Sequence, residues 1–164
     1  MATTDATVTY SETWNSKVGV WTVTPVIDTS LYATGDAVHT NDLLFTGFAR
    51  VSGGGGVFRK LTIIDKDLES AALELWLFSA AISATHTANG AWNAADADLA
   101  NVVAVIPSGP YFASSAGSVS VNASLDLRFR CVGGSSLWGA LVVRGAPTYT
   151  AATDLTIQLT AELD

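Results

Sequence analysis

Charged residues are scarce in this chain. Only 14% of the 164 residues are Asp, Glu, Lys or Arg, against about a quarter in an ordinary soluble domain, and the formal net charge is −7. The basic residues are scattered, at Lys17, Arg50, Arg59, Lys60, Lys66, Arg128, Arg130 and Arg144. Because no run of them can neutralise several phosphates, we expect no direct binding of nucleic acid. The acidity also disfavours an anionic membrane surface.

Cysteine and long apolar runs are also rare. Cys131 is the one cysteine, which excludes an internal disulfide, and its place in a predicted strand favours a small buried side chain over a nucleophile. No apolar stretch reaches the roughly 18 residues of a membrane span. Residues 1–5 lack a basic segment and an apolar one, so we expect no signal peptide and synthesis in a cytoplasm.

Motifs for catalysis are missing. His39 and His86 are the two histidines. Both lie among small polar residues in predicted loops, where a lone histidine is usually solvated. There is no Gly-x-Ser-x-Gly motif, and the glycine run 53–56 is not followed by the Gly-Lys-Ser/Thr of a phosphate-binding loop. Since no set of nucleophile, base and orienting group can be assembled, we expect neither an enzyme nor a cofactor.

Two Asp-x-Asp pairs are the only candidates for a metal site. Asp65 and Asp67 follow a predicted strand, and Asp96 and Asp98 lie in a predicted helix. Such pairs are compatible with Ca²⁺, which takes about six to eight oxygen ligands. Each pair offers only two side chains, and an acidic turn or helix start explains them without a metal. We therefore expect no metal site and keep calcium as an alternative.

Strand patterns, in contrast, are abundant. Residues 155–163 alternate apolar and polar side chains without a break, which predicts a strand with one face in the core. Such a strand must pair with an earlier one. The other predicted strands span residues 18–27, 43–51, 57–64, 72–78, 102–106, 125–131 and 137–144, and residues 7–10 would make a ninth. Residues 102–106 have the short apolar run of a strand buried on both faces.

The segments between the strands fit an all-β protein. The glycine run 53–56 can take backbone angles closed to other residues, and Asn93 is predicted to cap a short helix over residues 94–99. We predict a single-domain β-sandwich of residues 17–164, a jelly roll of about eight strands with one short helix. Residues 1–16 are polar and rich in threonine. They are predicted to be a flexible arm that orders against a neighbour, with simple disorder of a free end equally open.

The tryptophans give the strongest signal for a binding surface. In the strand 72–78, Trp76 has the opposite parity to three leucines, so it faces outward if the leucines face the core. A large aromatic ring on an outer face indicates contact with another protein, or less often with a sugar. The alternative is that the chain itself covers both faces of the sheet. Trp14 and Trp92 lie in predicted loops and are further contact candidates, whereas Trp21 and Trp138 are predicted to lie in the core.

Several segments, taken together, resemble a known family. They are residues 32–38, 61–73, 75–78, 95–106 and 137–157. In their order and spacing they resemble small virion proteins of tailed bacteriophages over about residues 31–163. Members of this family are usually structural proteins of the particle, so the resemblance implies a virion role and no catalytic residues.

From this resemblance we expect a capsid decoration (cement) protein on the capsid surface of the virion. Its partner would be the major capsid protein, and it would be a homotrimer or another homo-oligomer. Trp14, Trp76, Trp92 and the arm are its candidate contacts. A tail or head-tail accessory protein of the same virion is one alternative. A carbohydrate-binding or receptor-binding jelly-roll module is another.

Overall fold

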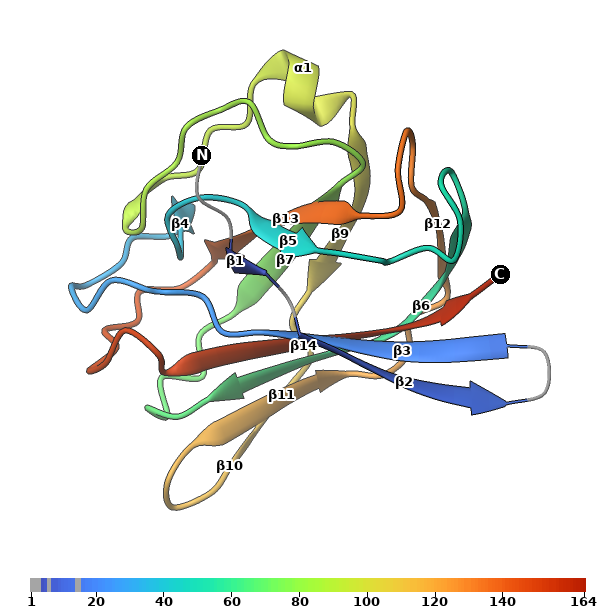
Figure 1. Ribbon diagram of the computed structural model, residues 1–164. Coiled ribbons are helices and arrows are strands. Elements are labelled where there is room, and N and C mark those ends of the chain that lie inside the picture. The colour runs from blue at the N-terminus through green and yellow to red at the C-terminus, as the bar shows by residue number, and fades with distance from the viewer. Residues whose placement is uncertain (1–3, 6, 14–15) are drawn as a thin grey trace.

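The protein is nearly all β. The computed structural model describes residues 4–5, 7–13 and 16–164, and Figure 1 shows two layers of strands. The strands are β1 (Thr4–Asp5), β2 (Thr7–Thr13), β3 (Ser16–Val23), β4 (Asp36–Ala37), β5 (Leu43–Phe45), β6 (Gly55–Asp65), β7 (Leu73–Phe78), β8 (Gly90–Ala91), β9 (Val102–Pro107), β10 (Tyr111–Ala113), β11 (Ser118–Asn122), β12 (Leu127–Arg130), β13 (Leu137–Val143) and β14 (Leu155–Leu163). The helix among these residues is α1 (Asp96–Leu99). No described helix has the length and apolar character needed to cross a membrane.

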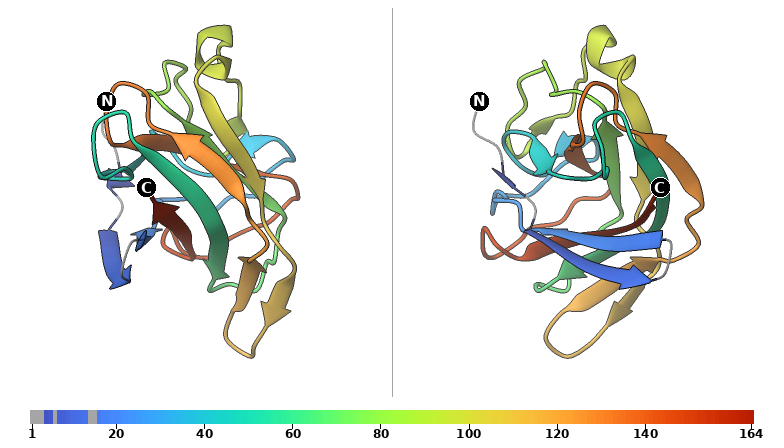
Figure 2. Two further views of the ribbon diagram at one scale, coloured as in Figure 1. Left: turned by 90° about the vertical axis from the view of Figure 1, so that its right-hand side faces the viewer. Right: turned by 45° about the vertical axis from the view of Figure 1, so that its right-hand side comes forward.

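The two sheets pack face to face as a β-sandwich. Sheet A has the order β5, β13, β7, β9, with β1 beside β5. The short strand β4 pairs with β13 on the same side as β5 does, and β8 pairs with β4. Sheet B has the order β10, β11, β6, β14, β3, β2, and β12 shares one edge of β6 with β11. The described pairs are antiparallel except for the parallel pair of β1 and β5. Most connections between the long strands cross from one sheet to the other (Figures 1 and 2).

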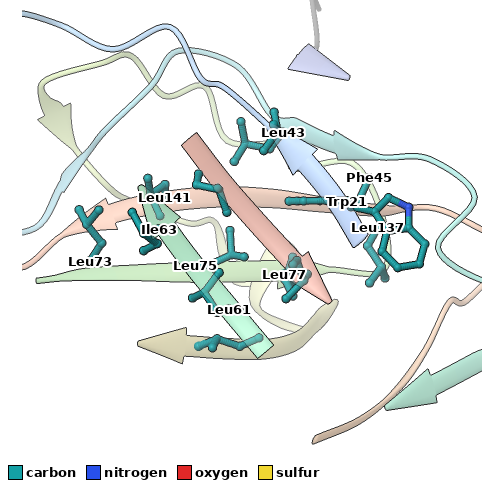
Figure 3. Close-up of a cluster of buried hydrophobic side chains, with 14 of the residues drawn as sticks. Trp21, Leu43, Phe45, Leu61, Ile63, Leu73, Leu75, Leu77, Leu137 and Leu141 are labelled. Carbon is teal, nitrogen blue, oxygen red and sulfur yellow. The ribbon is translucent and has the colours of Figure 1, made fainter. Parts of the chain in front are cut away.

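The core lies between the sheets and follows from the alternation of the strands. In β14 every second residue from Leu155 to Leu163 is buried and those between are half-buried, as the sequence predicts. β14 lies inside sheet B, paired with β6 on one side and β3 on the other. Figure 3 shows leucines of β7 and β13 from sheet A near Leu61 and Ile63 of β6 from sheet B.

Aromatic rings fill one part of this core. Trp21 is fully buried, as predicted, and it stacks on Phe48 with ring centroids 3.9 Å apart. Its indole Nε1 donates a hydrogen bond to the carbonyl of Thr46 at 3.0 Å. Phe58 and Phe129 stack at 4.4 Å. This part of the core is therefore tightly packed, and the indole N–H of Trp21 has its hydrogen-bond partner.

All the predicted strands are present, but several details differ. The strand predicted over residues 43–51 ends at Phe45, and Gly47 follows with a φ of 63° that turns the chain. Burial of residues 102–106 on both faces is wrong, because β9 is the edge strand of sheet A and Val105 is 38% exposed. The hairpin of β10 and β11 was not predicted.

The helix begins later than predicted and is not capped by Asn93. Ala95 occupies the N-cap of α1 in an extended conformation. The carboxylate of Asp98, at the third helical position, accepts the N–H of Ala95 at 3.3 Å. This contact is the half of a capping box that a side chain inside the helix supplies. The N-terminus of the helix is therefore capped by Asp98 of the helix itself.

Two segments of the predicted arm are paired with the sandwich. β2 lies beside β3 at the edge of sheet B, and β1 lies along β5. The division of the chain after residue 16 into an arm and a domain stays a prediction.

Candidate functional site

The outer face of sheet A carries an unusual set of aromatic rings. In β7 the leucines are buried, as predicted, whereas Glu74 and Trp76 are half-buried on the opposite face. The register of β7 with β13 places Trp76 opposite Ala140 and Phe78 opposite Trp138. We call the resulting surface the tryptophan face, and it consists of Trp76, Phe78, Trp92, Val102 and Trp138.

Trp92 joins the tryptophan face from a loop. Its ring meets Trp76 edge-on with centroids 6.2 Å apart, and it meets Phe78 at the same distance. The backbone N–H of Trp92 donates to the carbonyl of Gly35 at 2.8 Å, which fixes the loop beside β4. The structure thus brings together two of the three predicted contact residues, Trp76 and Trp92. The third, Trp14, lies outside the described residues.

Trp138 belongs to this face and not to the core, so its predicted place is wrong. It is half-buried and packs in the same cluster as Ile82, while Leu137 and Leu141 of the same strand point into the core. The prediction failed because β13 is apolar on both of its faces. An apolar run without alternation carries no information on which side chains point inward.

The segment 79–101 covers part of the tryptophan face and is held by buried carboxylates. Oδ1 of Asp98 accepts the N–H of Ser83 at 2.8 Å, and Oδ2 accepts the N–H of Ala84 at 3.0 Å. Oδ2 of Asp42 accepts a further backbone N–H of the segment at 3.0 Å. Burial alone would raise the pKa of Asp98, but these backbone donors outweigh it and the pKa is lowered. Asp98 therefore ties the two ends of the segment to each other, and Asp42 ties its first part to a residue outside it.

The two histidines, His39 outside this segment and His86 within it, form a buried pair. Their predicted solvation is wrong, since His39 is 1% exposed and His86 is 5% exposed. A carbonyl oxygen only accepts, so His39 Nδ1 and His86 Nε2 both donate to the carbonyl of Asn41, at 2.7 and 3.1 Å. His39 Nε2 then accepts the N–H of Leu141 at 3.0 Å. Burial lowers the pKa of His39 to about 3, so the imidazole is neutral near pH 7. In this form it connects the carbonyl of Asn41 to the backbone N–H of Leu141.

A carboxylate orients the ring of Trp76. Oε2 of Glu74 accepts the indole N–H of Trp76 at 3.1 Å and a guanidinium N–H of Arg144 at 2.7 Å. The hydrogen bond from Arg144 lowers the pKa of Glu74, so the carboxylate is charged near neutral pH. An aromatic ring held in place in this way loses little conformational entropy when a partner covers it.

The carboxylates of the other acidic pair, Asp65 and Asp67, stabilise the fold by accepting hydrogen bonds. Oδ1 of Asp65 accepts the N–H of Asp67 at 2.9 Å, and its Oδ2 accepts the N–H of Ser70 at 2.6 Å. Oδ2 of Asp67 accepts the N–H of Thr150 at 2.7 Å. Across the described ranges, no three His, Cys, Asp or Glu side chains gather as ligands for a metal ion. These carboxylates stabilise turns by accepting backbone hydrogen bonds.

The chemistry that the tryptophan face offers is apolar contact. Its three half-buried indoles and the exposed Val105 nearby on β9 can bury apolar area against another molecule, whereas Phe78 beneath them is already fully buried. The adjacent charges, Glu74 and Arg144, neutralise each other. Comparison with protein-family models, curated proteins and solved structures found no match for the chain.

Proposed function

We propose that this chain is a structural protein of a tailed-bacteriophage virion and that it decorates the capsid by binding capsid subunits. The observation that carries the proposal is the tryptophan face, where three half-buried indoles lie together on the outside of a sheet. Trp and other aromatic residues are enriched where proteins bind one another. The resemblance of residues 31–163 to small virion proteins supports the same role, as does the low content of charge.

We also propose that the sandwich is a jelly roll. Eight strands support this reading: β3, β5, β6, β7, β9, β11, β13 and β14. In this series the first strand pairs with the last, the second with the seventh, the third with the sixth and the fourth with the fifth. Such nesting is typical of one long hairpin rolled into two sheets. Jelly rolls occur in viral capsid proteins and in lectins, so this fold by itself does not choose between the two functions.

Decoration would work by adding contact area to the shell. Each Å² of apolar surface that the tryptophan face buries contributes about 25 cal/mol, before the costs of association are subtracted. Many copies on one lattice add up even where each contact is weak. A trimer on a threefold junction would repeat each contact by symmetry.

Sugar binding is less well supported. A sugar ring stacks on a flat and open aromatic surface, but the rings of Trp76 and Trp92 are inclined at 62° to each other and both are half-buried.

A tail or head-tail accessory protein would use the tryptophan face in the same way as a decoration protein. Copy number separates these two roles.

The first test is the protein's abundance in purified particles of the virus that encodes it. Gel densitometry and mass spectrometry should find it at a copy number close to that of the major capsid protein. A copy number far below this would favour the tail or head-tail role. Absence from the particles would overturn the proposal of a virion protein.

The second test locates the contact. Trp76→Ala should weaken rebinding of purified protein to particles that lack it by about tenfold or more, as loss of a central aromatic contact does. Phe112→Ala is the matched control, because Phe112 is an aromatic residue that is 60% exposed on β10 of sheet B. Thermal unfolding would show that both variants are folded. Equal binding by the two variants would exclude the tryptophan face as the contact.

A further inference from the structure

Three arginines without carboxylate partners gather at one end of the protein. Arg59 and Arg144 form salt bridges with acidic side chains. Within the part of the chain that the structure describes, Arg50, Arg128 and Arg130 form none. The chain as a whole has a net charge of −7, so a group of guanidinium ions without carboxylate partners makes this part of its surface locally positive.

These arginines line two hollows that flank β12. The first, of about 450 Å³, is lined by Arg128, Arg130 and Val132 on one side and by residues 100–103 on the other. The second, of about 500 Å³, is lined by Arg50 and again by Arg130. Arg130 therefore lies between the two hollows. Its Nε donates to the carbonyl of Gly53 at 2.8 Å, which leaves its terminal nitrogens for another acceptor.

The first hollow runs between the edges of the two sheets. β9 is the edge strand of sheet A, and β12 lies at an edge of sheet B (Figure 2). Among the described strands, β9 pairs with β7 alone and β12 pairs with β6 alone. An unpaired strand edge offers backbone N–H and C=O groups to an added extended segment.

We propose that this groove between β9 and β12 binds an extended segment of a partner protein in which acidic and apolar residues alternate. Arg128 and Arg130 are two residues apart and both exposed on the same face of one strand, so their Cα atoms are roughly 6.8 Å apart. Alternate carboxylates on an extended segment have the same spacing. A guanidinium group binds a carboxylate through two parallel hydrogen bonds, and Val132, which is 68% exposed, offers apolar contact beside them.

The charges at this end leave the two arginines available. The carboxylates of Asp126 and Glu162 are bound by Arg59 at 2.7 and 2.8 Å. Asp164 lines the second hollow and forms no salt bridge with Arg130 within the described residues. Nucleic acid fits less well than an acidic peptide, because three arginines on an acidic protein can neutralise few phosphates.

The test uses a fluorescein-labelled peptide of alternating Glu and Val and the purified full chain. Fluorescence anisotropy at low salt should show saturable binding that weakens as salt is added. The matched peptide of Gln and Val should bind about tenfold more weakly, and Arg128→Gln should weaken binding of the Glu peptide by about tenfold. Lys60→Gln is the control variant, because Lys60 is an exposed cation on β6 away from both hollows.

Other results would overturn the proposal. These are no binding of the Glu peptide, equal binding of the Gln peptide, or equal losses for Arg128→Gln and Lys60→Gln. Tighter binding of an oligothymidylate than of the Glu peptide would also overturn it, in favour of a phosphate ligand. The experiment needs no virus particle, so its outcome is independent of the proposed virion role.

Discussion

His39 and His86 meet edge to face, with ring centroids 5.5 Å apart and an angle of 86° between the rings. They share one acceptor, the carbonyl of Asn41. This pair connects β13, through the N–H of Leu141, to the segment that covers the tryptophan face. A proton added to Nε2 of His39 would replace an acceptor by a donor and break that connection.

The first prediction follows from this pair and concerns stability at mildly acidic pH. The pKa of His39 is lowered to about 3 by burial, from an ordinary 6.5. The unfolded chain therefore takes up a proton below pH 6.5 that the folded chain does not. The contribution of His39 to the free energy of unfolding is fully present above pH 6.5. At pH 5 this contribution is smaller by about 2 kcal/mol. Urea unfolding at pH 7.5 and pH 5 measures the loss.

The control for this prediction is His39→Asn. It should be less stable than the original chain at pH 7.5, because a buried hydrogen bond is lost, but its stability should depend less on pH. Burial raises the pKa of Asp42, and uptake of a proton there in the folded state offsets part of the effect in both proteins. Identical slopes for the two proteins would contradict the assignment to His39.

A second prediction concerns the anchor of segment 79–101. Asp98→Ala leaves the backbone N–H groups of Ser83 and Ala84 without their acceptor, which should cost about 2 to 4 kcal/mol. Hydrogen exchange of these amides should become faster. Asp96→Ala, in the same helix but exposed, should change stability by less than about 0.5 kcal/mol. Equal effects of the two substitutions would rule out the anchoring role.

A third prediction separates two glycines. A Cβ atom on Gly56 would lie 2.2 Å from the carbonyl oxygen of Glu162 in the neighbouring strand, whereas one on Gly134 would have no atom within 4 Å. Gly56→Ala should therefore destabilise the fold by about 3 kcal/mol or more, because the backbone of a central strand must move. Gly134→Ala should be neutral or stabilise by up to about 1 kcal/mol. Chemical denaturation of both variants measures the two changes in stability. If Gly56→Ala were tolerated, β6 and β14 would have to lie farther apart than they do in this structure.

A fourth prediction concerns the reactivity of Cys131. The side chain is fully buried, as predicted, although β12 ends one residue before it, and burial raises the pKa of its thiol to about 11. At pH 7.5 the thiolate is rare and inaccessible, so labelling by a disulfide reagent should be about 100-fold slower than for an open thiol. Unfolding in guanidinium chloride should release one rapidly reacting thiol. Fast labelling of the native protein would contradict the burial.

The elements that could be predicted are those whose two faces differ most. β7 and β14 alternate strongly because one face meets the core and the other is wetter, and this alternation also gave the orientation of Trp76. β13 has apolar side chains on both faces, since the tryptophan face is itself partly covered, and so Trp138 was assigned to the wrong side. The hairpin of β10 and β11 lies at the edge of sheet B. β11 does alternate serine with valine, but the strand is short and its buried residues are the serines, not the valines, so it lacks the pattern of apolar side chains facing a core.

The parts of the site that escaped prediction depend on contacts between remote segments. The small polar neighbours of His39 and His86 indicate solvated loops, and nothing local reveals that the two loops fold against each other. The glycine run 53–56 was predicted to need unusual backbone angles. Gly53 alone of the four has a positive φ, of 74°, whereas Gly55 and Gly56 are needed because neighbouring strands approach too closely for a side chain.

The place of β14 between β3 and β6 sets the order in which the protein can assemble. The ribosome makes β3 and β6 early and β14 after every other described strand. Until then β3 and β6 each lack the neighbour that joins them, so sheet B cannot close before β14 has been made. Folding must wait for contacts between the most distant parts of the chain, and such contacts make it slow.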